Sequence, residues 1–346
     1  MTRNRFSITN TIEKGVMLSA HFKAIAYARM QRYWLTGRKL AWAYELKARE
    51  WIKAHEPSIR ERARQYSLLM RLDKPIGTLL LLWPTLWALF IAADGLPSVH
   101  LLLVFIIGVF LTRSAGCVMN DYADRNFDRY VTRTQDRPLT TGKVSIREAF
   151  YLITSLLAIA FLLVLTTNRL TIILSVIAIP IGGFYPYMKR YVYIPQLFQG
   201  ISFGWGIPMA FAAATGTVPT IAWLLYMCSI LWSLTYDTMY AMVDREDDKK
   251  IGIKSTAILF EDTDRFFIGI IQLMLLTGFI LVGTQLKFGD YYNYALLVVG
   301  GIMIYQQYLI KDRLPKNCFR GFLSNNWLGA VVFIGIVLHY YNSHIT

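Results

Sequence analysis

A series of long apolar runs constrains this chain more than any other feature. Each run is close to the roughly 20 residues that a helix needs to cross a bilayer. The hydrocarbon core offers backbone groups no water, so runs of this length are expected to be helical. At 55% hydrophobic, the chain is also more apolar than a soluble domain requires. The sequence predicts an all-α, polytopic integral membrane protein with about nine transmembrane helices, near 76–94, 98–119, 147–166, 169–187, 194–215, 218–240, 264–284, 291–310 and 323–341.

The connections between these runs differ in charge. The short connections on one side, together with the C-terminal tail, contain only Arg169 and Lys287 as basic residues. Because cytoplasmic loops are enriched in Lys and Arg, the opposite loops and the N-terminus are predicted to be cytoplasmic. The net charge of +14 is therefore explained by topology, and no basic domain with base-stacking motifs suggests a nucleic-acid partner. The basic loops carry Arg125, Arg129, Arg133, Arg137, Lys143, Arg147, Lys189, Arg190, Arg245, Lys249, Lys250, Lys254, Arg265, Lys311, Arg313, Lys316 and Arg320.

The N-terminal part differs from the rest. We predict a basic, aromatic extension over residues 1–64, followed by a transmembrane domain over 65–346. Residues 1–74 hold 16 Lys or Arg against 6 Asp or Glu. A helix from about residue 21 to 54, ended by Pro57, is a candidate interfacial helix on an anionic membrane surface. A solvated extension or a partner-binding arm is the alternative.

An acidic patch directly follows the run 98–119. It reads Asn-Asp-Tyr-Ala-Asp-Arg-Asn-Phe-Asp over residues 120–128. On a helix, Asp124 and Asp128 lie about 60° and 20° from Asp121, so the three acids share one face. Like charges on one face repel each other unless a cation lies between them. Mg²⁺ prefers carboxylate oxygens together with substrate phosphates, so this patch predicts a magnesium–diphosphate site.

A second acidic patch, residues 237–248, ends the run 218–240 in the same way. Asp237, Asp244 and Asp248 again share a helical face. The charge pattern places both patches on the cytoplasmic side, as a shared site requires. The alternative is that acids merely gather where a helix leaves the bilayer. Cytoplasmic helix ends normally favour Lys and Arg, which makes that alternative weak for two patches.

These patches resemble those of the UbiA superfamily, the intramembrane aromatic prenyltransferases. The segments 71–77 (Arg-Leu-Asp-Lys-Pro-Ile-Gly) and 249–256 (Lys-Lys-Ile-Gly-Ile-Lys-Ser-Thr) narrow the resemblance to the 4-hydroxybenzoate polyprenyltransferase branch. The similarity extends over roughly residues 65–341. It implies a ring of helices around a central cavity in a bacterial inner membrane. The implied activity is Mg²⁺-dependent transfer from a polyprenyl diphosphate to position 3 of 4-hydroxybenzoate, a step of ubiquinone biosynthesis.

The chemistry assigns roles to the charged residues. The diphosphate leaves only if its developing negative charge is neutralised, which Mg²⁺ and nearby cations can do. We expect Asp121, Asp124 and Asp128 to hold one ion. The second patch, Asp237, Asp244 and Asp248, would hold another ion or share the first. Candidate phosphate partners are Arg125, Arg137, Lys143, Lys189 and Lys254, each of which could instead set topology or bind lipid headgroups.

The aromatic co-substrate needs partners of its own. The resemblance implies that an arginine at the position of Arg71 binds 4-hydroxybenzoate; a snorkelling interfacial arginine is the alternative. Asn120 would orient the ring or the diphosphate. The proton of the ring carbon would pass to Asp244 or to the departing diphosphate. Tyr240 and Tyr185 are candidate aromatic walls around a carbocation. The candidate catalytic residues are Asp121, Asp124, Asp244 and Tyr240.

Three other functions remain open from the sequence. Related enzymes that prenylate naphthoate, haem or a chlorophyll precursor would share the acidic patches. A transporter could use intramembrane acids as an ion path, although these acids gather at one membrane face and the runs lack paired broken helices. A soluble-type isoprenyl synthase is disfavoured by the membrane-length runs.

Overall fold

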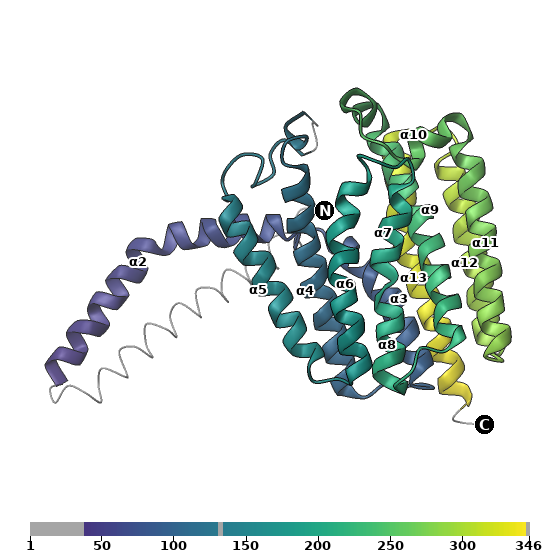
Figure 1. Cartoon of the computed structure of the whole chain (residues 1–346), viewed down its shortest axis with the longest axis horizontal. Helices are drawn as coiled ribbons and strands as arrows, with labels where there is room; N and C mark the ends of the chain where they lie inside the picture. Colours follow the sequence, from purple (N-terminus) through teal and green to yellow (C-terminus); the bar gives the residue numbers. More distant parts are fainter. Residues whose placement is uncertain (1–37, 131–133, 344–346) are drawn as a thin grey trace.

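The computed structural model (Figure 1) describes residues 38–130 and 134–343, and every regular element in these ranges is helical. The all-α prediction is confirmed. The helices are α2 (Arg38–Leu69), α3 (Ile76–Ala92), α4 (Val99–Asp124), η1 (Asp128–Tyr130), α5 (Ile146–Val164), α6 (Arg169–Met188), α7 (Pro195–Gly204), α8 (Gly206–Thr215), α9 (Thr220–Ile251), α10 (Thr256–Phe260), η2 (Glu261–Thr263), α11 (Asp264–Gln285), α12 (Asp290–Leu309) and α13 (Pro315–Ser343).

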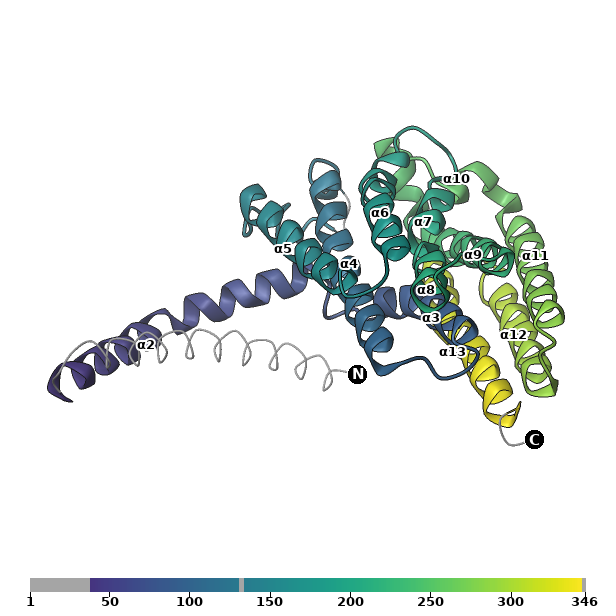
Figure 2. The same cartoon turned by 60° about the horizontal axis from the view of Figure 1, so that its bottom comes forward.

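The long helices form a closed bundle. Successive contacts run from α3 to α4, α6, the α7–α8 pair, α9, α11, α12 and α13, and α13 packs back against α3. Helix α5 lies against α4 at the edge, and α2 projects away from the bundle (Figures 1 and 2). The C-terminal ends of α4 and α9, the connection that contains η1, and helix α10 lie at one end of the bundle. The C-terminal end of α13 lies at the other end (Figure 1).

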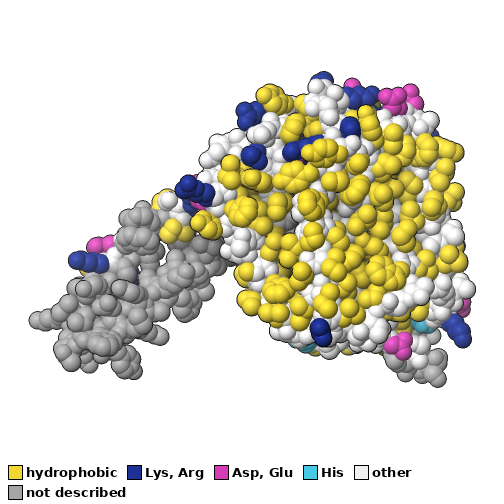
Figure 3. Space-filling view, viewed as in Figure 1, with side chains coloured by type: hydrophobic (Ala, Val, Ile, Leu, Met, Phe, Trp, Pro, Cys, Tyr) yellow, Lys and Arg dark blue, Asp and Glu magenta, His cyan; other side chains and the backbone are white. Residues whose placement is uncertain are grey.

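The outer surface of the bundle fits a membrane. Within the described residues, six helical segments are long and apolar enough to span: α4, α5, α6, α7–α8, α10–α11 and α13. Helix α3 is apolar but shorter, so the count of nine spans stays a prediction. Figure 3 shows an apolar band across the bundle, with most Lys and Arg near its upper end. Exposed apolar side chains of the bundle include Leu162 of α5, Val176 of α6, Leu273 of α11 and Ile304 of α12.

Local signals explain where several helices begin and end. Ser145 caps α5 in a reciprocal capping box with Glu148, and the Asn168 side chain accepts from the Thr171 amide at the start of α6. Helix α9 ends at Gly252, whose φ of 71° is left-handed and costs a residue with a Cβ more than a glycine. The run predicted over 194–215 is broken at Trp205 into α7 and α8.

The N-terminal prediction needs one correction. Pro57 does not end a helix but lies inside α2, which continues to Leu69. A proline removes one backbone hydrogen bond, yet tertiary packing holds the following turns. Ala63 and Leu69 are buried, and Leu69 packs against Val118 of α4. The predicted boundary between residues 64 and 65 therefore falls within one helix. The helix expected from residue 21 lies partly outside the described residues.

Candidate active site

The structure brings the two acidic patches together. Both line a polar cavity of about 190 Å³ at the bundle end where α4 and α9 terminate. This arrangement was expected if the two patches form one site. Of the residues singled out in the sequence, the cavity is lined by Arg71, Asn120, Asp124, Asp128, Arg137, Tyr185, Lys189, Asp237, Tyr240, Asp244, Asp248 and Lys254.

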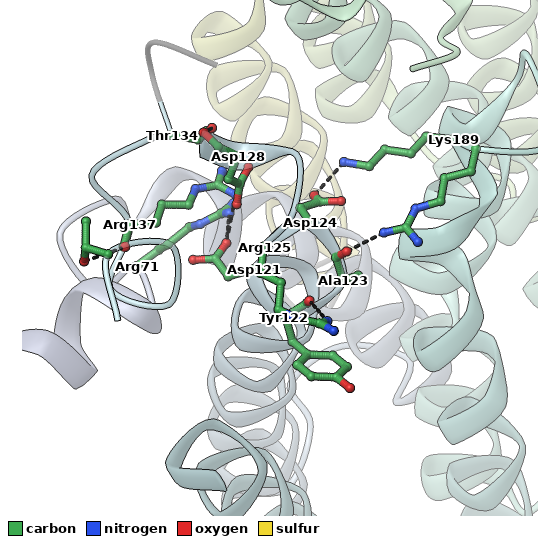
Figure 4. Close-up of polar contacts among 12 residues, drawn as sticks. Arg71, Asp121, Tyr122, Ala123, Asp124, Arg125, Asp128, Thr134, Arg137 and Lys189 are labelled. Atoms are coloured by element: carbon green, nitrogen blue, oxygen red, sulfur yellow. Dashed lines mark hydrogen bonds and ion pairs between the residues drawn. The ribbon is translucent and has the colours of Figure 1, made fainter. Parts of the chain in front are cut away.

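Two arginines neutralise part of the first patch (Figure 4). The Asp121 Oδ1 atom lies 2.7 Å from Nη2 of Arg71 and 3.0 Å from Nη1 of Arg137. The same Arg137 nitrogen lies 2.8 Å from Oδ2 of Asp128. Asp121 is only 2% exposed and stands behind the cavity wall rather than lining it. Arg71 thus links the start of α3 to the end of α4.

Asp124 is held differently. Its Oδ2 atom accepts a 2.5 Å hydrogen bond from Nζ of Lys189, which follows α6. Its Oδ1 atom is buried and has no hydrogen-bond partner among the described residues. A buried carboxylate oxygen without a partner is costly unless a cation or donor binds it. Asp124 is therefore the acid of this patch best prepared to accept a ligand.

The pKa of Asp128 is affected by burial and by the charges around it. Burial raises the pKa of the Asp128 carboxyl above its usual value, and the neighbouring carboxylates of Asp124 and Asp121 raise it further. Arg137 acts in the opposite direction by stabilising the charged form. A cation bound beside Asp128 would stabilise the charged form of this carboxyl and lower its pKa.

The second patch reaches the cavity from α9. Asp237, Asp244 and Asp248 line the cavity from this one helix, as their spacing predicts. Tyr240, which lies between Asp237 and Asp244 in the sequence, also lines the cavity. The centre of its ring lies 4.9 Å from the centre of the Phe322 ring.

Two predicted phosphate partners are not brought to the cavity. The Arg125 guanidinium donates to the backbone oxygen of Tyr122 and lies 4.6 Å from the centre of that residue's ring. Figure 4 shows this contact, away from the ion pairs of Arg71 and Lys189. Lys143 is exposed on the loop before α5 and does not line the cavity. All three residues lie in or just after the first acidic patch, so their positions in the sequence could not show that only Arg137 lines the cavity.

A second cavity, of about 310 Å³, lies in the membrane-spanning region next to the polar one. It lies among α3, α4, α5, α6, α7 and α8 and has a mostly apolar lining. Tyr185 of α6 lines both cavities, and its hydroxyl accepts a 2.9 Å hydrogen bond from Asn120. A polar head with an apolar tail could therefore occupy both spaces at once.

Arg113 is a site residue that the sequence interpretation missed. It lies in α4 and lines the apolar cavity, with its guanidinium 5.7 Å from the centre of the Phe203 ring. Across residues 38–130 and 134–343, no carboxylate lies within ion-pair distance of this guanidinium. The signal was available, because an arginine inside a spanning run is costly and marks function by default.

The carboxylates do not form a complete metal site by themselves. In the part of the chain that the structure describes, no three acidic, histidine or cysteine side chains are close enough to hold an ion together. Arg71, Arg137 and Lys189 pair with the first patch instead. Mg²⁺ commonly binds through one or two carboxylates plus substrate phosphates, and the free Oδ1 of Asp124 fits that mode.

Comparison with known proteins identifies the family. The model of the UbiA prenyltransferase family matches residues 81–334. A relative from Photobacterium profundum is 53% identical over 277 residues, covering 80% of this chain and 96% of that protein. A relative from Aeromonas hydrophila is 54% identical over 281 residues, covering 81% and 98%. Both relatives are named 4-hydroxybenzoate octaprenyltransferase.

Solved structures support the same fold. A UbiA homologue from Aeropyrum pernix K1 has a TM-score of 0.68 at 24% identity and covers 76% of this chain and 98% of its own. A homologue from Archaeoglobus fulgidus, solved with GPP and Mg²⁺, has a TM-score of 0.61 at 17% identity, covering 79% and 99%. With its family match, its helical bundle and relatives above half identity over most of its length, this chain belongs to the UbiA prenyltransferase family.

Proposed function

We propose that this protein transfers a polyprenyl group from a polyprenyl diphosphate to 4-hydroxybenzoate, at position 3, ortho to the hydroxyl. The observation that carries the proposal is that a polar and an apolar cavity lie side by side and share Tyr185 as a lining residue. One cavity is lined by acids and cations, and the other mostly by apolar groups. A polyprenyl diphosphate has the same division between head and tail. The relatives named 4-hydroxybenzoate octaprenyltransferase support the acceptor and a long-chain donor.

The polar cavity would bind the diphosphate. Lys189, Arg137 and Lys254 line it and supply positive charge for phosphate oxygens. One or two carboxylates from each patch would hold Mg²⁺ against those oxygens, with Asp124 and Asp128 as candidates in the first patch and Asp237, Asp244 and Asp248 in the second. When bound, Mg²⁺ neutralises the charge that develops on the leaving diphosphate. The structure of an Archaeoglobus fulgidus homologue bound to GPP and Mg²⁺ supports the use of a divalent metal with a prenyl diphosphate.

We assign the carboxylate of the aromatic acid to Arg113. The sequence prediction was Arg71, but that guanidinium is already paired with Asp121 at 2.7 Å. Arg113 lacks such a pair among the described residues and lies at the apolar cavity beside Phe203. A guanidinium with no carboxylate within ion-pair distance among the described residues favours a carboxylate ligand, which it can bind through two parallel hydrogen bonds. Asn120 and Tyr185 would orient the acceptor near the diphosphate.

The reaction is an electrophilic aromatic substitution. The allylic C–O bond breaks and its electron pair leaves with the diphosphate. The ring carbon ortho to the hydroxyl then forms a bond to the allylic carbon, and the proton of that ring carbon departs. Asp244 or the departing diphosphate accepts this proton. The faces of Tyr240 and Tyr185 stabilise positive charge on the allylic group and keep water away from it.

The proposal includes a place in the cell. We infer a bacterial inner membrane, with the active site at the cytoplasmic side, and a role in ubiquinone biosynthesis. The strong excess of Lys and Arg in the loops at the end of the bundle that carries both acidic patches supports this orientation. Membrane lipids surround the apolar band.

Product formation in membranes tests the function. Membranes that contain the protein receive radiolabelled 4-hydroxybenzoate or a dihydroxynaphthoate, octaprenyl diphosphate and Mg²⁺. We expect labelled prenyl-4-hydroxybenzoate, its loss on addition of EDTA, and its return with excess Mg²⁺. Product from the naphthoate alone would contradict the proposed acceptor. Absence of prenyl transfer to either acceptor by folded protein would overturn the proposed reaction.

A further inference from the structure

Gly77, in the first turn of α3, faces the Arg113 side chain of α4. A Cβ atom at Gly77 would lie 2.6 Å from Nε and 2.8 Å from Cζ of Arg113, and closer still to Nη2. Such contacts are shorter than real Cβ atoms show, so a side chain at residue 77 would displace the guanidinium. The three nearest atoms all belong to the far end of this one flexible side chain, which gives way more easily than a helix backbone.

The space left by Gly77 therefore determines where the positive charge of Arg113 stands. The guanidinium lies against the α3 backbone and near the Phe203 ring, at the wall of the apolar cavity. A larger residue would push it away from α3. A bidentate ion pair depends on the position of both nitrogens, and a shift of about 1 Å is enough to lose much of its contribution.

We propose that Gly77 is a specificity-determining position: its missing side chain places Arg113 so that the enzyme selects a carboxylate-bearing aromatic acceptor. This inference rests on the proposed function. Gly77 acts through Arg113 and does not itself contact the substrate, so it is a positioning residue. An uncharged acceptor of the same shape would not depend on it.

The test compares Gly77→Ala with wild type in membranes. The KM for 4-hydroxybenzoate is measured together with the KM for octaprenyl diphosphate and the Ki of 4-hydroxybenzamide, an uncharged analogue that competes with the acid. We expect the KM for 4-hydroxybenzoate to rise about tenfold or more. The Ki of the amide and the KM for the diphosphate should stay within about twofold of wild type, because neither depends on the displaced charge.

Gly301 provides a matched control. It lies in α12, lines neither cavity, and a Cβ atom there would meet nothing within 4 Å. Gly301→Ala should therefore leave all three constants unchanged. A double variant tests the route of the effect: in an Arg113→Ala background, Gly77→Ala should add no further rise in the KM for 4-hydroxybenzoate.

The possible outcomes separate the inference from the proposed function. No prenylation of 4-hydroxybenzoate by wild type would overturn the function itself. If wild type is active, a Gly77→Ala enzyme with the kinetics of Gly301→Ala would overturn the inference alone. So would an equal loss of affinity for the acid and the amide, or an additive effect in the Arg113→Ala background.

Discussion

Asp124 has the least satisfied carboxylate of the candidate site. One of its oxygens accepts from Lys189, and the other is buried without a partner among the described residues. The Asp121 carboxylate, by contrast, pairs with both Arg71 and Arg137 through one oxygen. From these differences we propose distinct tasks for the neighbouring acids. Asp121 would tie helices together, whereas Asp124 would offer an oxygen to the substrate complex.

We therefore expect Asp124→Asn to lower prenyl transfer by about 100-fold, the usual loss when one electrostatic contact to a transition state is removed. The amide keeps the size of the side chain but loses its charge, so a higher Mg²⁺ concentration should be needed for half-maximal rate. Initial rates over a Mg²⁺ titration measure both effects. Asp136→Asn is the control, because Asp136 is exposed and does not line the cavity. A wild-type response to Mg²⁺ in Asp124→Asn would contradict its assignment.

A second prediction for a single residue concerns Arg113. Arg113→Ala should reduce kcat/KM for 4-hydroxybenzoate by about 30-fold, which corresponds to the roughly 2 kcal/mol of a charge-assisted hydrogen bond. The discrimination between 4-hydroxybenzoate and 4-hydroxybenzamide should disappear, while the KM for octaprenyl diphosphate stays unchanged. Steady-state kinetics with both compounds provide the measurement. If the variant still discriminates between the two compounds as wild type does, Arg71 rather than Arg113 binds the carboxylate of 4-hydroxybenzoate.

Among the helices, α9 depends on a buried ionic cluster at its charged end. Asp264, the first residue of α11, is fully buried and pairs with Arg245 of α9. Its other oxygen lies 3.0 Å from Nε of Arg313, in the connection before α13. Arg245 directly follows Asp244, so the cluster fixes the part of α9 that carries the second acidic patch. Three elements thus meet at one carboxylate.

Removing that carboxylate leaves a nearly buried arginine without its charge partner. We expect Asp264→Asn to lower the free energy of unfolding by about 3 kcal/mol, at the lower end for broken buried pairs because the Arg313 side chain is 32% exposed. Thermal unfolding in detergent measures the change. Asp247→Asn serves as the comparison, since its 3.3 Å contact with Lys250 is exposed and contributes less than about 1 kcal/mol. Equal effects of the two substitutions would refute the structural role of the cluster.

At the scale of the whole molecule, the surface charge predicts an orientation in the membrane. The end of the bundle that carries the acidic patches should face the cytoplasm, and the α8–α9 connection should face the opposite compartment. All three cysteines are buried, so introduced cysteines can be labelled with little background. Thr141→Cys and Thr217→Cys place a thiol at exposed positions at the two ends.

A membrane-impermeant maleimide applied to intact spheroplasts should label Thr217→Cys but not Thr141→Cys. Inverted inner-membrane vesicles should show the reverse. The reason is that loops rich in Lys and Arg are retained on the cytoplasmic side during insertion. Labelling of Thr141→Cys from the outside would place the acidic patches in the other compartment and would contradict the proposed site of action.

The sequence alone determined the features that depend on neighbouring residues. Hydropathy located the helical runs, and helical periodicity put Asp237, Asp244 and Asp248 on one face. Charge distribution grouped both acidic patches at one end of the molecule. Each of these properties is local or additive along the chain. For this reason, the helical fold and most of the polar site could be inferred before any packing was known.

The tertiary structure decided which of many similar charges meet. Nothing in the sequence distinguishes Arg137, which bridges two carboxylates, from Arg125, which turns onto its own helix. Packing also allows α2 to continue past Pro57 as a helix. It placed Gly77 against Arg113, although α3 and α4 contribute them from distant positions. These outcomes depend on distances between helices, and an ion pair or a steric contact changes over about an ångström, a scale that periodicity and hydropathy do not specify.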